Sequence, residues 1–277
     1  MLADCHIHMV LDGVNWKQAI AGHADAPRES FIRKCLQTYQ SLGYTYLRDG
    51  GDRWGVGAKA RSLSPEYGIT YRTPLAPLCK QGHYGSFIGA VYASMKEYAD
   101  LVVKTREDGG DFIKIMISGL MDFDRFGVLT EPGLPPEEIK ELIRIAHEEG
   151  MAVMAHANGA RTIEAAAVAG VDSVEHGAYQ DEDSLCAMAE NGCVWVPTLS
   201  TVGNLRGKGR FSEAAVERIL ESALCNVARY EGLIASGTDA GAWAVPHGSR
   251  TEEALLTQAG VTQERIEQGA AAIKRKF

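Results

Sequence analysis

The sequence is poor in positive charge and has no long hydrophobic run, and both features exclude classes of protein. Its 36 aspartates and glutamates outnumber its 28 lysines and arginines, for a formal net charge of −8. The few basic clusters, such as residues 274–276, form no stripe that could follow a phosphate backbone. No apolar run approaches the length of a membrane span, and the N-terminus has no charged-then-apolar leader. We therefore expect no nucleic-acid partner, no membrane partner and a cytoplasmic location.

The cysteine pattern lacks every signature of a disulfide framework or a zinc knuckle. The six cysteines are scattered through expected strands and helices, and no two of them form a Cys-x-x-Cys pair. Reduced and mostly buried thiols are the expected state. The chain also has no internal repeat, no low-complexity tract and no segment of linker composition, so residues 1–277 are expected to form a single domain.

The chain instead contains strands that alternate with amphipathic helices from end to end. With 277 residues, of which 45% are hydrophobic and 23% charged, it is long enough to bury a large core. Periodic helical stretches separate short apolar or β-branched runs. These runs span residues 3–8, 44–49, 69–76, 112–117, 152–157, 172–176, 193–199 and 233–238. Eight such strands predict an α/β protein with a slightly distorted (β/α)8 TIM barrel.

Two histidines stand two positions apart in the first expected strand. Successive strand residues point to opposite faces, so His6 and His8 project the same way, with Cα atoms about 6–7 Å apart. The first strand of a barrel ends at the face where active sites lie. A pair of partly exposed histidines on an edge strand explains the same motif, so the later strands have to distinguish the two interpretations.

Later strand ends supply further residues of the ligand type. Lys114 lies inside an apolar strand. Its amine could snorkel to the strand end or pair with a carboxylate. Alternatively, burial could lower its pKa enough for the neutral amine to form a carbamate with carbon dioxide. His156 and His176 end the fifth and sixth expected strands, and Asp239 ends the eighth, where it could also cap a helix. Together these groups form a nitrogen and oxygen ligand set that suits zinc, or otherwise manganese, iron or nickel.

Seven stretches in barrel order carry a resemblance to a known family. They are residues 4–8 (DCHIH), 43–49 (GYTYLRD), 112–116 (FIKIM), 155–157 (AHA), 171–177 (VDSVEHG), 196–199 (VPTL) and 237–241 (GTDAG). As an ordered set they resemble the amidohydrolase superfamily, in particular its imidazolonepropionase and Xaa-Pro dipeptidase-like branch. In that branch a carboxylated lysine bridges two metal ions.

The resemblance implies a binuclear site with two divalent ions, zinc above all. It implies that His6, His8, Lys114 and Asp239 hold one ion, and that carboxylated Lys114 together with His156 and His176 holds the other. The sequence differs from the family pattern in two respects. Position 158 is Asn158 where many relatives have a second histidine, and the small β-sandwich of the relatives is not found, which leads us to expect a homo-oligomer.

The implied reaction is hydrolysis of an amide-like C–N bond in a small-molecule substrate, such as a dipeptide, an N-acyl amino acid or a cyclic amide. Two divalent ions lower the pKa of a shared water, so that a metal-bound hydroxide attacks at neutral pH. Asp239 is expected to take the proton and pass it to the leaving nitrogen. The ligand set also permits a lactone or phosphoester hydrolase, or a metal-binding scaffold without catalysis.

Substrate contacts are expected from loops after the strands. Two of these loops, residues 9–27 and 118–134, are long and rich in Gly, Asp and Pro. A Gly-His element like that at residues 82–83 follows the third strand in the family, so the resemblance implies a catalytic role for His83. Further substrate-binding candidates from the loops are His83 itself, Tyr84, Arg125, Tyr179 and His247. Arg48 is expected to form an internal ion pair under the barrel mouth.

Overall fold

A computed structural model describes residues 2–277, and its strands follow the predicted order. The strands are β1 (Leu2–Ile7), β2 (Tyr44–Asp49), β3 (Thr70–Arg72), β4 (Leu78–Lys80), β5 (Ala90–Tyr92), β6 (Ile113–Met116), β7 (Val153–Ala157), β8 (Ser173–His176) and β9 (Val194–Val196). All strand pairs are parallel, in the orders β1-β2-β3 and β5-β4-β6-β7-β8-β9.

Helices fill most of the connections between these strands. They are α1 (Trp16–Ala21), α2 (Glu29–Ser41), α3 (Val56–Leu63), the 3-10 helix η1 (Ser64–Tyr67), α4 (Met95–Glu107), α5 (Pro136–Glu148), α6 (Ala160–Val168), α7 (Glu182–Glu190), α8 (Ser200–Gly203), α9 (Glu213–Arg229), α10 (Thr251–Gln258) and α11 (Gln263–Lys276). None of them is long and apolar enough to cross a lipid bilayer. The local signals act as predicted in α5, which starts with proline and two acids and is followed by Gly150 at φ 71°.

The predicted eighth strand closes the ring between the two sheets. Residues 233–238 form no regular strand, and one isolated bridge, from Ile234 to Trp195, lies within them. On one side, Trp195 of β9 donates to Leu233 and accepts from Ala235, both at 2.9 Å. On the other side, Cys5 of β1 donates to Ser236 at 2.9 Å. The segment therefore occupies the position of a barrel strand with few ladder hydrogen bonds.

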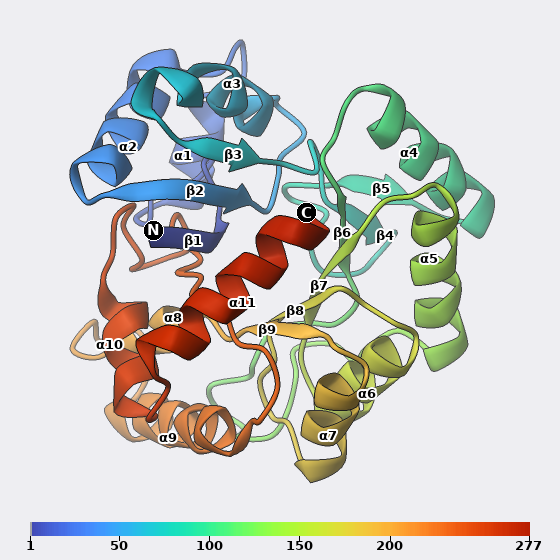
Figure 1. The fold of residues 1–277 in the computed structure, drawn as a ribbon, viewed down its shortest axis with the longest axis vertical. Coiled ribbons are helices and arrows are strands. Elements are labelled where there is room, and N and C mark those ends of the chain that lie inside the picture. The colour runs from blue at the N-terminus through green and yellow to red at the C-terminus, as the bar shows by residue number, and fades with distance from the viewer. Residues whose placement is uncertain (1) are drawn as a thin grey trace.

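The third strand is the site of the expected distortion. Of the predicted run 69–76, only residues 70–72 form a strand, β3, which pairs with β2. The strand that pairs with β6 is β4, which follows this run and was not predicted. Residues 73–77 connect these two strands, with Leu75 at φ 64°. The fold is thus the predicted (β/α)8 barrel, with helices packed around the strands (Figure 1).

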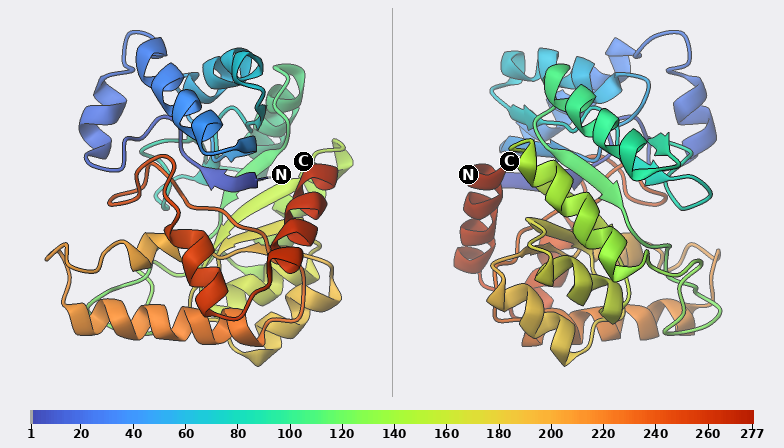
Figure 2. Two further views of the ribbon diagram at one scale, coloured as in Figure 1. Left: turned by 60° about the vertical axis from the view of Figure 1, so that its left-hand side comes forward. Right: turned by 90° about the vertical axis from the view of Figure 1, so that its right-hand side faces the viewer.

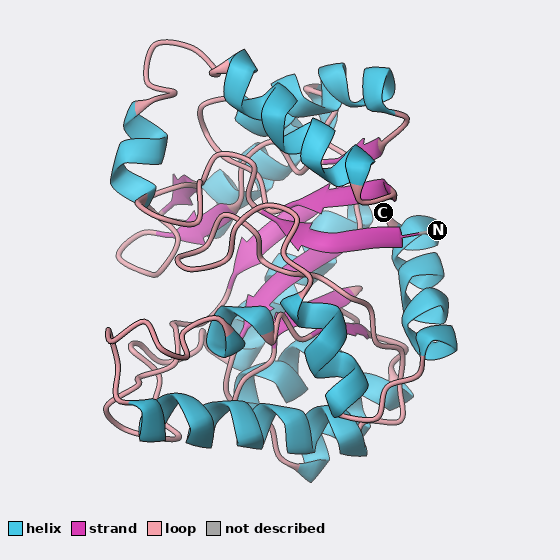
Figure 3. Cartoon of the chain, turned by 90° about the vertical axis from the view of Figure 1, so that its left-hand side faces the viewer, coloured by secondary structure: helices cyan, strands magenta, loops and turns pink. Residues whose placement is uncertain are grey.

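Helix α11 covers the end of the barrel at which the strands begin (Figures 2 and 3). Its residues Ile273 and Ala270 pack with the side chains inside the barrel, including Tyr46, Phe112 and Met154. Loops that follow the strands gather at the opposite end (Figure 3). Because α11 and the side chains packed against it close this end of the barrel, an open site has room only at the carboxyl ends of the strands.

Candidate metal centre

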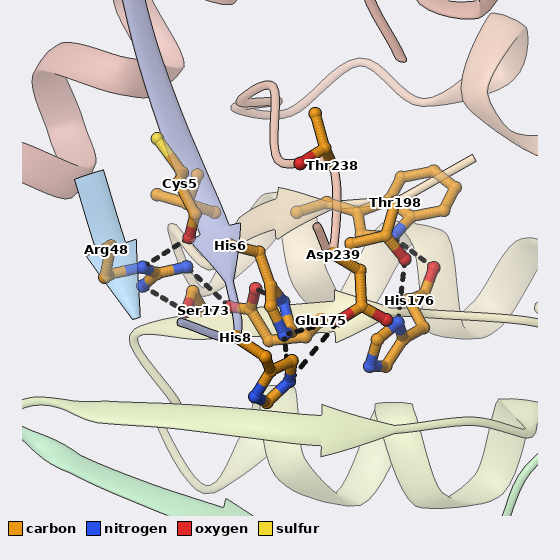
Figure 4. Close-up of polar contacts among 12 residues, drawn as sticks. Cys5, His6, His8, Arg48, Ser173, Glu175, His176, Thr198, Thr238 and Asp239 are labelled. Carbon is orange, nitrogen blue, oxygen red and sulfur yellow. Dashed lines mark hydrogen bonds and ion pairs between the residues drawn. The ribbon is translucent and has the colours of Figure 1, made fainter. Parts of the chain in front are cut away.

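Three of the predicted ligands converge at the carboxyl ends of the strands (Figure 4). Nε2 of His6 lies 3.4 Å from Nε2 of His8, and Oδ1 of Asp239 lies 3.6 Å from the first and 3.3 Å from the second. The potential ligand atoms of these residues all lie within 4.8 Å of one another. The first strand and the eighth segment therefore build one donor cluster.

Hydrogen bonds between β1 and the closing segment hold this cluster together. The amide of Asp239 donates to the carbonyl of His6 at 2.7 Å, and the amide of His8 donates to Ala240 at 2.7 Å. Asp239 adopts a left-handed φ of 56°. The buried carboxylate of Asp4 accepts from the amide of Thr238 at 2.9 Å and from its hydroxyl at 2.6 Å. Asp4, which the sequence did not single out, thus fixes the turn that carries Asp239.

His156 and His176 lie next to the cluster. Their ring centroids are 4.5 Å apart, and the ring of His176 is 5.1 Å from that of His6. Nδ1 of His176 bonds to the hydroxyl of Thr198 at 2.7 Å, and Nε2 of His156 lies 3.2 Å from the carbonyl of Gly119. The remaining nitrogens, Nε2 of His176 and Nδ1 of His156, are therefore the ones available to a ligand.

Burial keeps these imidazoles neutral. Desolvation lowers the pKa of His8 and of His156 to about 3, and it lowers the pKa of His6 and of His176 well below the usual value. The charge of Lys114 contributes to each of these shifts. Neutral imidazoles offer a lone pair, which is the form that binds a metal ion.

Lys114 lines the same cavity as the four histidines and has no polar partner among the described residues. Its side chain is 1% exposed, and within residues 2–277 no group forms a hydrogen bond with its Nζ atom. Desolvation lowers the pKa of this ammonium to about 8. The alternatives of a snorkelling lysine or a salt-bridged one are therefore not what the structure shows.

The donor set fits a divalent metal ion. Buried polar atoms without a hydrogen-bond partner among the described residues include Nζ of Lys114 and Oδ1 of Asp239, both of them atoms of predicted ligands. Burial raises the pKa of the Asp239 carboxyl to about 8, and the charge of Lys114 offsets only part of this rise. A cation among these atoms would stabilise the carboxylate and reverse that shift. Neutral nitrogen and carboxylate oxygen are ligands that zinc and related ions accept.

Glu175 is a functional residue that the sequence interpretation missed. Its Oε2 lies 2.7 Å from Nδ1 of His6, and its Oε1 accepts from Arg48 at 2.7 Å and from Ser173 at 2.6 Å (Figure 4). This network directs Nε2 of His6 toward the cluster. A signal was present, because Glu175 and Arg48 are opposite charges inside apolar strands, which burial requires to be paired. The ion pair expected for Arg48 exists, and Glu175 is its partner.

A cavity of about 720 Å³ opens above the cluster. Both long loops contribute to its wall, the first through Leu11, Val14 and Trp16 and the second through residues 120–124 and Thr130. The expectation that these loops cover the site agrees with this geometry. A cavity of this size holds a drug-sized ligand.

Of the predicted substrate residues, only Tyr84 is among those that line this cavity. Its ring centroid is 4.9 Å from that of His156. His83, although next in sequence, is outside the lining, and its Nδ1 faces Glu131 at 3.9 Å. The structure thus brings Tyr84, and not His83, to the cavity wall.

The other three candidates have structural contacts instead. Arg125 is exposed and forms a salt bridge with Asp122 at 2.6 Å, and the ring of Tyr179 packs on Phe126 at 5.2 Å. His247 bonds to the hydroxyl of Tyr39 at 3.1 Å and to the carbonyl of Leu11 at 2.9 Å. The polar groups of Arg125 and His247 are thus occupied by other residues, and none of the three side chains lines the cavity.

Asn158 replaces the second histidine of many relatives with a structural group. Its Nδ2 donates to the carbonyl of Gly119 at 3.0 Å, and its Oδ1 accepts from the amide of Ala178 at 2.9 Å. Through Asn158, which follows β7, these bonds connect the loop after β6 with the loop after β8. Asn158 lines the cavity but has both ends of its amide occupied.

The fold and the donor cluster together define a (β/α)8-barrel protein with a candidate metal centre at its strand ends. The chain belongs to the amidohydrolase family, whose model matches residues 67–277. The resemblance inferred from the sequence is thereby confirmed.

Two relatives show how far this similarity extends along the chain. Ochratoxinase of Aspergillus niger is 27% identical over 275 residues, covering 85% of this chain and 55% of the relative. An uncharacterized protein of Mycobacterium tuberculosis is 34% identical over 134 residues, covering 45% of this chain and 36% of the relative. The chain thus spans about half the length of the ochratoxinase.

Solved structures show the same fold. A Xaa-Pro dipeptidase with bound methionine has a TM-score of 0.78 at 23% identity, covering 99% of this chain and 75% of that one. The A. niger ochratoxinase structure has a TM-score of 0.77 at 24% identity, covering 99% and 68%. A prolidase complexed with N-methylphosphonate-L-proline has a TM-score of 0.76 at 22% identity, covering 99% and 73%.

Proposed function

We propose that this protein is a metal-dependent hydrolase that cleaves an amide-like C–N bond in a dipeptide, an N-acyl amino acid or a cyclic amide. The observation that carries the proposal is the convergence of His6, His8 and Asp239 within 4.8 Å at the barrel mouth, beside a buried Lys114 without a partner. Membership of the amidohydrolase family and the names of its relatives support the same class of reaction.

Two divalent ions, zinc above all, would be held by six residues in or directly after β1, β6, β7, β8 and the closing segment. His6, His8, Lys114 and Asp239 would bind one, and Lys114, His156 and His176 the other. For Lys114 to serve both, its neutral amine adds to carbon dioxide, a C–N bond forms, one proton leaves, and the carbamate offers two oxygens. The ions would activate water and polarise a carbonyl group.

The protein's own groups supply the proton transfer and the geometry. Oδ1 of Asp239 faces the histidines, so its second oxygen, Oδ2, is the atom that accepts a proton from water and returns it to the leaving nitrogen. Glu175 fixes the orientation of His6 through its Nδ1 atom. Tyr84 lies over His156 and covers that side of the cluster.

Asp239→Asn tests the proton-transfer role. The substitution keeps the shape of the side chain but removes its basicity, so we expect kcat to fall by at least about 10²-fold. Asp100→Asn, at an exposed helix position, is the matched control and should keep full activity. The assay panel contains dipeptides, N-acyl amino acids, cyclic amides, lactones and phosphoesters. Turnover of lactones or phosphoesters alone contradicts the proposal, as does full activity of Asp239→Asn.

Removal of the metal by a chelator should abolish turnover, and two equivalents of zinc should restore it. Elemental analysis of the active protein should give two ions per chain, and a value of one contradicts the bridging role of Lys114.

We also propose that the protein acts in the cytoplasm as a homo-oligomer. Light scattering tests the assembly, and a monomeric mass contradicts it.

A further inference from the structure

One wall of the cavity above the metal centre is aromatic and partly exposed. Trp16 from α1 packs edge-on against Phe87 at 5.2 Å, and Phe87 contacts Tyr84 at 5.9 Å. Trp16 remains 46% exposed. We call these three residues the Trp16 wall. Leu120, which is 40% exposed, also lines the cavity, so the mouth as well as the wall presents apolar groups.

A second aromatic wall comes from loops on the other side of the strand ends. Phe123, which follows β6, stacks on Phe211, which precedes α9, with ring centroids 4.1 Å apart and planes 15° apart. Trp243 lines the cavity from the loop after the closing segment. We call Phe123, Phe211 and Trp243 the Phe211 wall. Figure 2 shows α1 and the start of α9 on opposite sides of the edge where the strands end, so the cavity lies between two flat apolar surfaces.

Arg210 is the charged group of the Phe211 wall. Its guanidinium carbon lies 4.8 Å from the ring centroid of Trp243 and 5.4 Å from that of Phe211. The side chain lines the cavity and is exposed. Within residues 2–277 it forms no salt bridge, whereas Arg206 pairs with Glu217 at 2.6 Å. Arg210 is therefore held by stacking and has its N–H donors available.

We infer that Arg210 recognises a carboxylate at the outer end of the substrate, and that the substrate is an amide with a flat apolar body. This inference rests on the proposed function and adds the substrate class to it. The metal-centre residues are buried at the floor of the cavity, while Arg210 lies exposed at its rim. The scissile carbonyl must reach the floor, so the group that meets Arg210 lies at the opposite end of the molecule.

The chemistry of the guanidinium favours a carboxylate as its ligand. Stacking uses the faces of the planar group and leaves its N–H edges for two parallel hydrogen bonds, which match the two oxygens of a carboxylate. Besides Asp239 of the metal centre, two acids share the cavity with Arg210. Asp122 is already paired with Arg125, and Asp124 is exposed and forms no salt bridge with Arg210 in the described structure. Asp124 is therefore the acid that competes with Arg210 here, because it would favour a cationic group on the substrate instead of a carboxylate.

Three model amides that differ only in the outer substituent test this inference. Each carries a naphthyl body, and the outer group is a carboxylate, a carboxamide or a trimethylammonium. Calorimetry with the metal-loaded protein gives Kd for the corresponding non-hydrolysable amines, and the product amine gives kcat and KM for the amides. Binding and turnover are thus measured separately.

Wild-type protein should bind the carboxylate probe about tenfold more tightly than the carboxamide probe. Arg210→Met keeps the apolar length of the side chain but removes its charge, so the preference should disappear through a rise in Kd and KM with little change in kcat. Arg210→Lys should restore part of it. Arg218→Met is the matched control, because Arg218 also lies over an aromatic ring, that of Phe126 at 4.1 Å, but outside this cavity. This control variant should prefer the carboxylate probe as strongly as wild type does.

Equal binding of carboxylate and carboxamide by wild type overturns the inference, and so does tighter binding of the ammonium probe, which would assign recognition to Asp124. An equal loss of all three probes in Arg210→Met means that the arginine only supports the wall, and this result also overturns it. If the carboxylate preference and its loss in Arg210→Met are observed but no amide is hydrolysed, the inference on Arg210 stands and the proposed hydrolysis fails.

Discussion

At the scale of single residues, the candidate site depends on buried charges that hold neutral ligands in place. Glu175 illustrates this, because its carboxylate is fully buried and contacts Nδ1 of His6 at 2.7 Å. Arg48 compensates the charge from the other side at 2.7 Å. A carboxylate on the far nitrogen of a ligating histidine fixes the tautomer and raises the basicity of the ring.

Glu175→Gln should therefore weaken metal binding about 10- to 100-fold with little change in the fold. The amide keeps the shape of the side chain but is a weaker acceptor for the N–H of His6. Competition with a fluorescent chelator measures the affinity. Glu182→Gln, an exposed pair with Arg229, should bind metal as wild type does, and unchanged affinity in Glu175→Gln would show that Glu175 does not orient His6.

Replacement of Lys114 should raise the stability of the metal-free protein but lower its metal binding and activity. Lys114→Met replaces an unpartnered buried amine with an apolar side chain of similar length, so the metal-free protein should gain about 1 kcal/mol or more in its free energy of unfolding. The same variant should bind fewer than two ions and lose turnover. Urea unfolding of metal-free protein and elemental analysis measure the two effects. A loss of stability in the metal-free variant would mean that Lys114 has a partner in solution.

At the scale of elements, the closing segment and α11 depend on one close approach. A Cβ atom at Gly269 of α11 would lie 1.9 Å from the carbonyl oxygen of Ile234. Ile234 belongs to the closing segment, which lies between β9 and β1 in the barrel. Helix α11 therefore packs directly on the backbone that completes the barrel. A glycine in mid-helix costs helix propensity, and this contact explains why it is tolerated.

Gly269→Ala should lower the free energy of unfolding by about 1–3 kcal/mol, because the helix has to move away from residue 234. By helix propensity alone the same change would stabilise the protein. Thermal or urea unfolding distinguishes the two signs. Gln268→Ala, at an exposed position of the same helix, is the control and should be neutral or slightly stabilising; a similar gain in Gly269→Ala would contradict the close contact.

At the scale of the whole molecule, the buried acids and histidines determine how stability depends on pH when no metal is bound. Desolvation raises the pKa of Asp4 to about 7 and that of Glu252 to about 8. The folded state then holds protons that the unfolded state releases, and stability falls as pH rises toward these values. Histidines with lowered pKa, such as His8 and His156, act in the opposite direction, but only below their unfolded value of 6.5.

Between pH 6.5 and pH 8 the acids dominate, so the metal-free protein should lose stability as pH rises through this window. Lys114, whose pKa is lowered to about 8, opposes this trend only toward the upper end of the window. Glu252→Gln should reduce the slope by up to about 1.4 kcal/mol per pH unit. The amide oxygen can still accept from Ser200, whose amide donates to Glu252 at 2.7 Å. Urea unfolding at pH 6.5, 7.2 and 8 gives the slopes, and identical slopes for wild type and variant would contradict a raised pKa at this position.

Much of the molecule was predictable from the order of residue types. Short apolar runs separated by amphipathic helices determined the barrel, because strand and helix periods are local properties of the chain. The strand-end residues His6, His8 and Asp239 could be placed together because parallel strands end at one face. The early end of the third strand at Arg72 and the separate strand β4 at residues 78–80 were not predictable, since the left-handed φ of Leu75 between them has no clear local signal.

The sequence by itself thus determined the fold class, the family and the residues of the candidate metal centre. Only the tertiary structure decided that Glu175 contacts His6 across 169 positions, that Arg125 is occupied by Asp122, and that Arg210 faces the cavity. The physical reason is that ligand positions follow from strand ends, which the local pattern specifies. Side chains on long loops take their positions from packing between segments distant in sequence, such as the stacking of Phe123 on Phe211.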